Sequence, residues 1–205
     1  MKNIKMIIFD LDGVLVDACD WHKIALNKAL KNVSGYEISE EEHSLIFNGI
    51  PTKKKLEILN KRNNVDFSLN DEIFDKKQEY TIEAIKTFCK KDNTKIELIK
   101  ELKSQGFIVC CFTNSISKTA NLMLSLCGVI DMFDSIVTNE NVLNPKPDPE
   151  GYSNICKIFN INPENVVIVE DSIKGKQAAY ASGCNVIEVN NAVDVNLKLF
   201  KGILK

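Results

Sequence analysis

Five short apolar runs, which do not alternate with polar residues, dominate the hydrophobic pattern of this chain. Uninterrupted runs of this length are typical of strands that are buried on both faces of a sheet. The runs occupy residues 6–9, 107–112, 135–137, 166–169 and 186–189. The pattern therefore predicts five strands, each covered on both sides.

Helical patterns separate the last four runs. The first opens with Thr94-x-x-Glu97, a capping-box sequence, and stops at Gly106. The remaining helical stretches end at Gly128 or span residues 149–159 and 174–183. Because strands that alternate with helices form parallel sheets, the chain is expected to have an α/β fold with a Rossmann-like core.

A long insertion interrupts this alternation. Residues 10–106 separate the first two predicted strands, which is far more chain than one crossover helix requires. Within this gap, residues 18–87 look helical throughout and contain a second capping-box sequence, Ser39-x-x-Glu42. We therefore predict a core of residues 1–17 and 88–205 and an inserted all-helical cap domain of residues 18–87.

Composition describes a globular protein and excludes several partners. The 205 residues are 44% hydrophobic and carry a net charge of −2, which gives no electrostatic reason to expect nucleic acid or an anionic membrane. The only basic run, Lys53-Lys54-Lys55, is expected to be a solvated helix face. Because no apolar stretch has the length of a signal peptide core or a membrane span, the predicted location is the cytoplasm.

The cysteines favour the same compartment. There are seven, an odd number, with no C-x-x-C pair and no histidine spacing that suits zinc. A chain of this length buries a core without disulfide staples, so we expect reduced core thiols. A regulatory disulfide is the alternative.

Polar segments follow four of the predicted strands, at the edge where open parallel sheets bind ligands. In isolation, each has an ordinary explanation as a turn, a helix cap or a stiff loop. The segments are Asp10-Leu11-Asp12-Gly13, Thr113-Asn114-Ser115, the proline-rich loop around Lys146, and Glu170-Asp171-Ser172. Since their places in the pattern are not independent, we expect them to converge on one cleft.

Convergence would bring up to four carboxylates together: those of Asp10, Asp12, Glu170 and Asp171. Carboxylates in one cleft repel each other, and a hard divalent cation relieves the repulsion. Oxygen ligands without histidine or thiol favour Mg²⁺ over zinc. Lys146, Thr113 and Asn114 would add positive charge and donors, which a phosphoryl group needs.

These segments, in this order, resemble the motifs of the haloacid dehalogenase superfamily, in its branch of phosphatases and phosphomutases with a helical cap. The resemblance covers essentially the whole chain. It implies Asp10 as the nucleophile that forms an aspartyl-phosphate, and Asp12 as the general acid and base. It also implies that Thr113 and Asn114 hold phosphate oxygens, while Lys146 neutralises both the phosphoryl group and Asp10.

The resemblance also implies a metal site. Mg²⁺ would be held by the Asp10 carboxylate, the Asp12 backbone carbonyl and Asp171, with Glu170 as a direct or water-mediated ligand. The presence of Asp12 argues against two relatives, because dehalogenases lack a general acid there and transport ATPases carry a threonine.

Specificity is expected to reside in the cap. His22 falls where β-phosphoglucomutase-like relatives have a histidine, and residues 48–52 resemble the specificity loop of the cap. Mutases of that subgroup have an arginine at the position of Thr52. The absence of this arginine favours a phosphatase. The expected substrate-binding residues are Asn114, Ser115, His22, Gly49, Thr52, Lys53 and Lys77.

The leading hypothesis is a Mg²⁺-dependent phosphatase that acts on a small phosphorylated metabolite, such as a sugar phosphate, through an aspartyl-phosphate. A monomer is favoured, although the sequence leaves the oligomeric state open. A phosphomutase of the β-phosphoglucomutase type is the alternative. A phospho-aspartate signalling switch is the third reading; its acceptor belongs after an interior strand, and its length leaves no room for a 70-residue insertion.

Overall fold

The computed structural model describes residues 3–204, and its centre is a parallel sheet of five strands in the order β3-β2-β1-β4-β5. The five predicted strands are confirmed, with ends that differ by at most one residue. Their bounds are Met6–Phe9 (β1), Ile108–Phe112 (β2), Ser135–Val137 (β3), Val166–Glu170 (β4) and Asn185–Glu188 (β5). β1 lies at the centre of the sheet, so Asp10 follows an interior strand, as the phosphoacceptor of a signalling switch does. The position of the strand therefore does not argue against a signalling switch, whereas the long insertion does.

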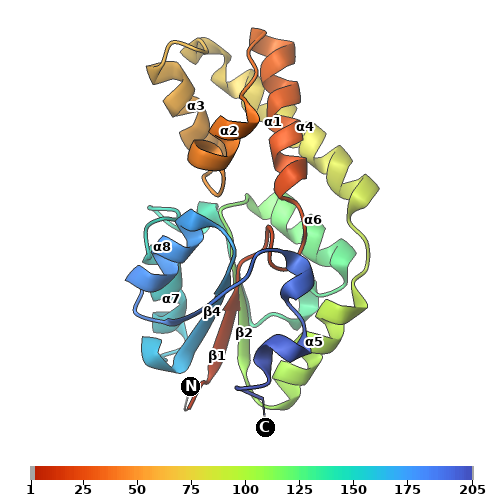
Figure 1. Cartoon of the computed structure of the whole chain (residues 1–205), viewed down its shortest axis with the longest axis vertical. Helices are drawn as coiled ribbons and strands as arrows, with labels where there is room; N and C mark the ends of the chain where they lie inside the picture. Colours follow the sequence, from red (N-terminus) through yellow and green to blue (C-terminus); the bar gives the residue numbers. More distant parts are fainter. Residues whose placement is uncertain (1–2, 205) are drawn as a thin grey trace.

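Helices cover both faces of the sheet (Figure 1). Alternate residues of a strand point to opposite faces. Ile7 and Phe9 of β1 belong to the core under α5 and α6, and Met6 and Ile8 belong to the core under α7 and α8. These helices span Asn93–Ser104 (α5), Ser117–Cys127 (α6), Glu150–Ile158 (α7) and Ile173–Ala181 (α8). Burial on both faces explains why the central strands β1, β2 and β4 are apolar without alternation. The expectation of cover on both sides is wrong for the edge strands β3 and β5, which are partly exposed and contain Ser135, Asn185 and Glu188.

One helix start and one helix end were predicted correctly, and another helix start was not. Ser39 accepts a hydrogen bond from the Glu42 amide at a helix start, and α6 ends at Gly128 with a positive φ of 84°. The capping box at Thr94 is wrong, because the side chain of Asp92 accepts hydrogen bonds from the first free amides of α5. A carboxylate placed two residues earlier satisfies these amides and complements the helix dipole.

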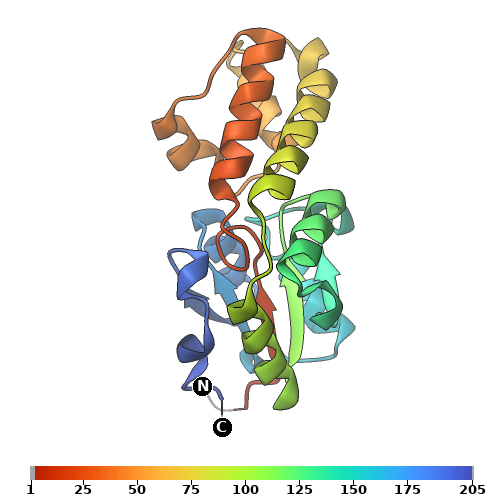
Figure 2. The same ribbon diagram turned by 90° about the vertical axis from the view of Figure 1, so that its right-hand side faces the viewer.

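The insertion between β1 and β2 forms a helical cap above the sheet (Figure 1). Its elements are α1 (Cys19–Ser34), α2 (Glu40–Glu42), a π-turn at His43–Phe47, α3 (Thr52–Lys61), a 3₁₀ turn at Phe67–Leu69 and α4 (Asn70–Phe88). The long helices α1 and α4 run side by side (Figure 2). The cap has its own apolar cluster, which includes Leu26, Leu30, Phe47, Leu59 and Ile73.

The predicted fold class, a Rossmann-like core with an inserted helical cap, is confirmed. The expectation that residues 18–87 are helical throughout is wrong in detail, because residues 35–39, 48–51 and 62–66 connect the helices. The domain bounds themselves stay a prediction. Short 3₁₀ turns complete the core at Ile130–Met132, Asn139–Asn141, Pro163–Asn165, Ala192–Asp194 and Leu197–Phe200.

The cysteines are free thiols, and all except the partly exposed Cys19 are buried. The Sγ atoms of Cys156 and Cys184 lie 3.8 Å apart. Within residues 3–204, none of the helices has both the length and the apolarity that a membrane crossing requires.

Candidate active site

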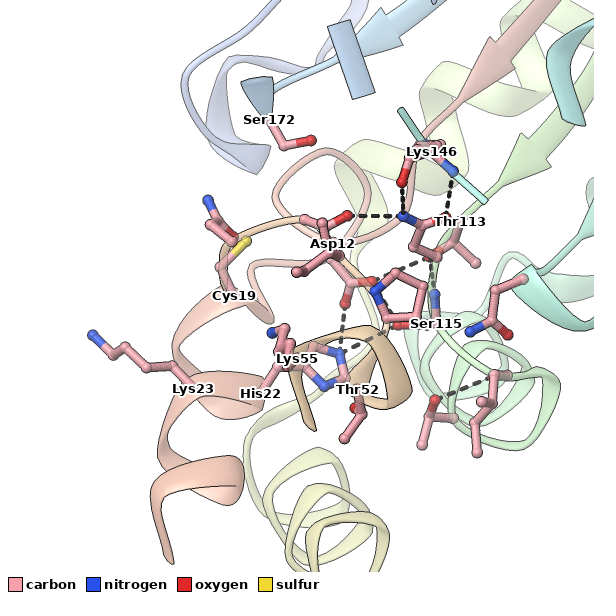
Figure 3. A pocket seen from close by; sticks show the side chains of 18 of the residues that line it. Asp12, Cys19, His22, Lys23, Thr52, Lys55, Thr113, Ser115, Lys146 and Ser172 are labelled. Atoms are coloured by element: carbon pink, nitrogen blue, oxygen red, sulfur yellow. Dashed lines mark hydrogen bonds and ion pairs between the residues drawn. The ribbon is translucent and has the colours of Figure 1, made fainter. Parts of the chain in front are cut away.

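The strand order creates the site. The chain leaves β1 toward β2 on one side and returns to β4 on the other, and ligands bind at the carboxyl ends of strands where the order reverses. Asp10 follows β1, Thr113 follows β2, and Asp171 follows β4. These ends open into a cavity of about 530 Å³ between the sheet and the cap (Figure 3).

Three carboxylates gather at one end of this cavity, where Asp10 and Asp171 line it and Glu170 is buried behind them. Oxygens of Asp10, Glu170 and Asp171 lie within 4.8 Å of one another. Gly13, with a φ of +87°, lets the chain turn beside them, and a Cβ there would collide with the Asp171 carboxylate. Glycine at position 13 is thus required both for the turn and for the close approach of the acid.

Lys146 holds this acidic group together. Its Nζ donates to Asp10 Oδ1 at 2.7 Å, to the Phe112 carbonyl at 2.8 Å and to Glu170 Oε1. Burial lowers the pKa of Lys146, but the charges of Asp10 and Glu170 raise it more, so the pKa lies above its ordinary value. Burial and the charge of Glu170 raise the pKa of Asp10, and the charge of Lys146 lowers it by less. The pKa of Asp10 therefore also lies above its ordinary value.

Glu170 is enclosed by donors. Besides Lys146, the hydroxyl of Tyr152 donates to Glu170 Oε1 at 2.7 Å, and the Asp171 amide donates to Oε2. The side chain has no exposed surface, and a Cβ on Gly175 would occupy the space of its carboxylate. Tyr152 was not predicted from the sequence, because a tyrosine in an apolar helix face is indistinguishable from a core residue.

The acidic group fits a hard divalent cation. Oδ1 of Asp171 is buried without a hydrogen-bond partner in the described chain. Burial and the neighbouring Glu170 raise the pKa of Asp171 to about 7. One ammonium cannot offset three carboxylates, and an all-oxygen donor set suits Mg²⁺. The Asp12 side chain faces elsewhere, so its expected share in the metal site, through the backbone carbonyl, stays a prediction.

Metal-free protein should lose stability as pH rises from about 4 to about 7. Asp171 has a folded-state pKa raised from 3.8 to about 7, so the folded protein binds this proton more tightly than the unfolded chain. Mg²⁺, which replaces the proton, should raise the melting temperature more at pH 8 than at pH 5. Thermal denaturation with and without Mg²⁺ measures both effects, and Asp171→Asn should reduce both. An equal Mg²⁺ shift in that variant would contradict the assignment.

Asp12 lies at the centre of a second network (Figure 3). Its Oδ2 accepts hydrogen bonds from Ser115 at 2.8 Å and Thr113 at 3.2 Å, and its Oδ1 lies 2.9 Å from His22 Nε2. Lys77 Nζ lies 3.2 Å from the other ring nitrogen, Nδ1. Because an ammonium only donates, Nδ1 accepts and the proton of a neutral His22 sits on Nε2, where it is donated to Asp12.

This network controls the charge of Asp12. Burial raises the pKa of Asp12, but His22 and Ser115 lower it by more. The pKa of this carboxyl therefore lies below its ordinary value. Burial, then the charge of Lys77, lowers the pKa of His22, which keeps the ring neutral. Sequence alone placed His22 near the site, whereas its link to Lys77, 55 positions away, depends on the packing of α1 against α4.

Asn114 joins the cap to the core. Its Nδ2 donates to the Gly49 carbonyl at 2.8 Å and to the Lys146 carbonyl at 3.1 Å, and its Oδ1 accepts from the Lys146 amide. These bonds place the loop that carries Lys146. The expected contact of Asn114 with a phosphate oxygen stays a prediction.

The cap residues that line the cavity differ in how deeply they are buried. Thr52 begins α3 and lines the cavity together with Gly49 and the exposed Lys53. The expectation of a solvated face for the basic run is wrong for Lys55, which is 9% exposed and also lines the cavity. Its burial follows from α3, where positions 55, 56 and 59 share the inner face.

Comparison with known proteins agrees with this architecture. The family model of haloacid dehalogenase-like hydrolases matches residues 7–189. The phosphorylated carbohydrates phosphatase of Thermotoga maritima is 30% identical over 181 residues, covering 88% of this chain and 82% of that protein. The phosphoglycolate phosphatase of Nitrosospira multiformis is 27% identical over 188 residues, covering 89% and 82%.

A solved structure shows the same fold. The β-phosphoglucomutase of Clostridium difficile superposes with a TM-score of 0.82 at 24% identity, covering 97% of this chain and 96% of that one. With the family match, the chain belongs to the haloacid dehalogenase-like hydrolases. The resemblance seen in its motifs and the expected enzyme class, a hydrolase of the phosphatase type, are thereby confirmed.

Proposed function

We propose that this enzyme is a Mg²⁺-dependent phosphatase that removes the phosphoryl group of a small phosphorylated metabolite. The observation that carries the proposal is the position of Asp10, which lines the cavity, accepts a hydrogen bond from the buried ammonium of Lys146 and lies within 4.8 Å of the carboxylates of Glu170 and Asp171. Relatives named as phosphatases of phosphorylated carbohydrates and of phosphoglycolate support this substrate class.

In this mechanism Asp10 is the nucleophile. One oxygen, Oδ1, is held by Lys146, which orients the carboxylate and offsets its charge. Attack on phosphorus breaks the ester bond and leaves the phosphoryl group on Asp10, after which water releases it. A bound Mg²⁺, held by Asp10 and Asp171, would supply charge neutralisation for the phosphoryl oxygens.

Asp12 handles the protons. It must protonate the leaving oxygen in the first step and take a proton from water in the second. Its hydrogen bonds to His22, Thr113 and Ser115 hold it ionised in the ligand-free site, which suits the base role. We propose that the negative charge of a bound phosphoryl group opposes this ionisation and raises the pKa of Asp12, which then serves as the acid.

Asp12→Asn should separate the two steps. With p-nitrophenyl phosphate, whose leaving group needs no proton, we expect a stoichiometric burst of nitrophenol followed by turnover slowed about 100-fold. With an alkyl phosphate, whose leaving group needs a proton, no burst is expected. Stopped-flow absorbance and phosphate release measure these phases, and Asp131→Asn, at an exposed position outside the cavity, is the matched control.

A metabolite panel tests the function itself. Wild-type enzyme with Mg²⁺ should release phosphate steadily from small phosphomonoesters. Isomerisation of a hexose phosphate stimulated by a bisphosphate would indicate a mutase instead. Absence of turnover across the panel would contradict the phosphatase proposal.

A further inference from the structure

Two buried lysines of the cap line the cavity. Lys55 lies on α3 and Lys77 on α4, and they are 9% and 6% exposed. Lys77 is bonded to His22, as described above. The ammonium of Lys55 has no hydrogen-bond or ion-pair partner within residues 3–204. Because the side chain is largely removed from water, an ammonium without a partner destabilises the empty cap.

The charge balance of the cap favours an anion. Burial lowers the pKa of Lys55 to about 8, and burial together with the charge of Lys55 lowers the pKa of Lys77 to about 7. Asp12 is the acid that most favours the charge of both lysines, yet it makes no ion pair with either and already accepts three hydrogen bonds. Neither lysine is therefore neutralised by an ion pair, and an anionic ligand in the cavity would supply that partner.

The other lysines near the cavity have different surroundings. Lys23 pairs with Asp20 and Glu40, and Lys53 is exposed. In the view of Figure 3, Asp12 is drawn between Lys146 and Lys55, and the charge of Lys55 is near enough to lower the pKa of His22, after burial and the charge of Lys77. A ligand whose phosphate reaches Asp10 would therefore extend past Asp12 toward Lys55.

We propose that Lys55 binds a second anionic group, a carboxylate or a phosphate, on the leaving group of the substrate. This inference rests on the proposed phosphatase function and narrows its substrates to phosphomonoesters that carry such a group. Lys77 adds to the positive field, while its bond to His22 keeps it in place. His43 and Gln78 line the same cavity. Nε2 of His43 and Oε1 of Gln78 are buried and have no hydrogen-bond partner in the described chain.

Matched substrate pairs test the inference. Glycerol 3-phosphate and 3-phosphoglycerate differ in a terminal carboxylate, and fructose 6-phosphate and fructose 1,6-bisphosphate differ in a second phosphate. We expect kcat/KM to be about 10- to 100-fold higher for the anionic member of at least one pair, as for hydrogen bonds between charged groups. The pair that shows the preference identifies which anion is read.

Lys55→Met should abolish this preference. The variant is expected to lose about 10- to 100-fold in kcat/KM on the anionic substrate and to remain within about 2-fold of wild type on the neutral one. Its melting temperature should rise, because an apolar side chain replaces an unpaired buried charge. Lys55→Gln, polar but neutral, should lose the same preference, and Lys54→Met, on the exposed face of α3, should retain it.

The outcomes separate the two proposals. If wild type releases no phosphate even from p-nitrophenyl phosphate with Mg²⁺, the phosphatase function itself fails. If it releases phosphate but treats both members of each pair alike, only the assignment of Lys55 fails. Equal losses on neutral and anionic substrates in both Lys55 variants, with a lower melting temperature, would show that Lys55 is structural and would overturn the inference.

Discussion

Asp10→Asn is expected to lower kcat for phosphomonoester hydrolysis by about 10⁴-fold or more, because the amide cannot form the covalent phosphoryl intermediate. The variant should remain folded. It removes one of three clustered carboxylates, while Lys146 keeps its contacts with Glu170 and the Phe112 carbonyl. In metal-free protein we therefore expect a melting temperature at or above that of wild type.

Three measurements check this prediction. Single-turnover experiments with a ³²P-labelled substrate should label wild type, and not Asp10→Asn, with an acid-stable phosphoryl group. Steady-state phosphate release gives the loss in kcat. Thermal denaturation excludes misfolding, with the exposed Asp75→Asn as the control. Substantial turnover by folded Asp10→Asn would mean that another group, or water directly, attacks phosphorus.

The core and the acidic end of the cavity could be predicted from the sequence because they depend on local pattern. Strands buried on both faces are uninterrupted apolar runs, so their ends, and the polar residues that follow, could be placed within one residue. Parallel strands put those ends at one edge, which is how Asp10 and Asp171 meet across 160 residues of chain. Order along the chain was therefore sufficient to bring the acids and Lys146 together.

The cap was harder to read because burial there depends on how helices pack. A run of three lysines has the composition of a solvated face, yet the helical rotation of α3 turns Lys55 inward and leaves Lys54 outside. The bond between His22 and Lys77 requires α1 and α4 to lie side by side, which no local pattern specifies. Asn114 illustrates a third limit: its residue type suits phosphate, while its amide bonds backbone groups of two loops.

Lys146→Met should damage both stability and activity, because it leaves buried carboxylates without their counter-charge. Removal of one partner of a buried ion pair costs about 3–5 kcal/mol, and loss of a preorganised charge at a reacting phosphoryl group costs about 10³-fold in kcat. Both effects arise from one ammonium that contacts Asp10 and Glu170 at once. The exposed Lys157→Met is the control on α7.

The stability loss of Lys146→Met should depend on pH with a defined sign. The pKa of Asp10 is already raised in wild type, and without the opposing charge of Lys146 it rises further. A folded state with a raised carboxyl pKa gains stability as pH falls, so the difference from wild type should narrow between pH 8 and pH 5. The double variant Lys146→Met/Glu170→Gln, which removes a carboxylate as well, should recover part of the loss at pH 8. Denaturant unfolding of wild type, Lys146→Met, Glu170→Gln and the double variant at both pH values measures this cycle. A stability difference independent of pH would mean that packing, and not charge, makes Lys146 indispensable.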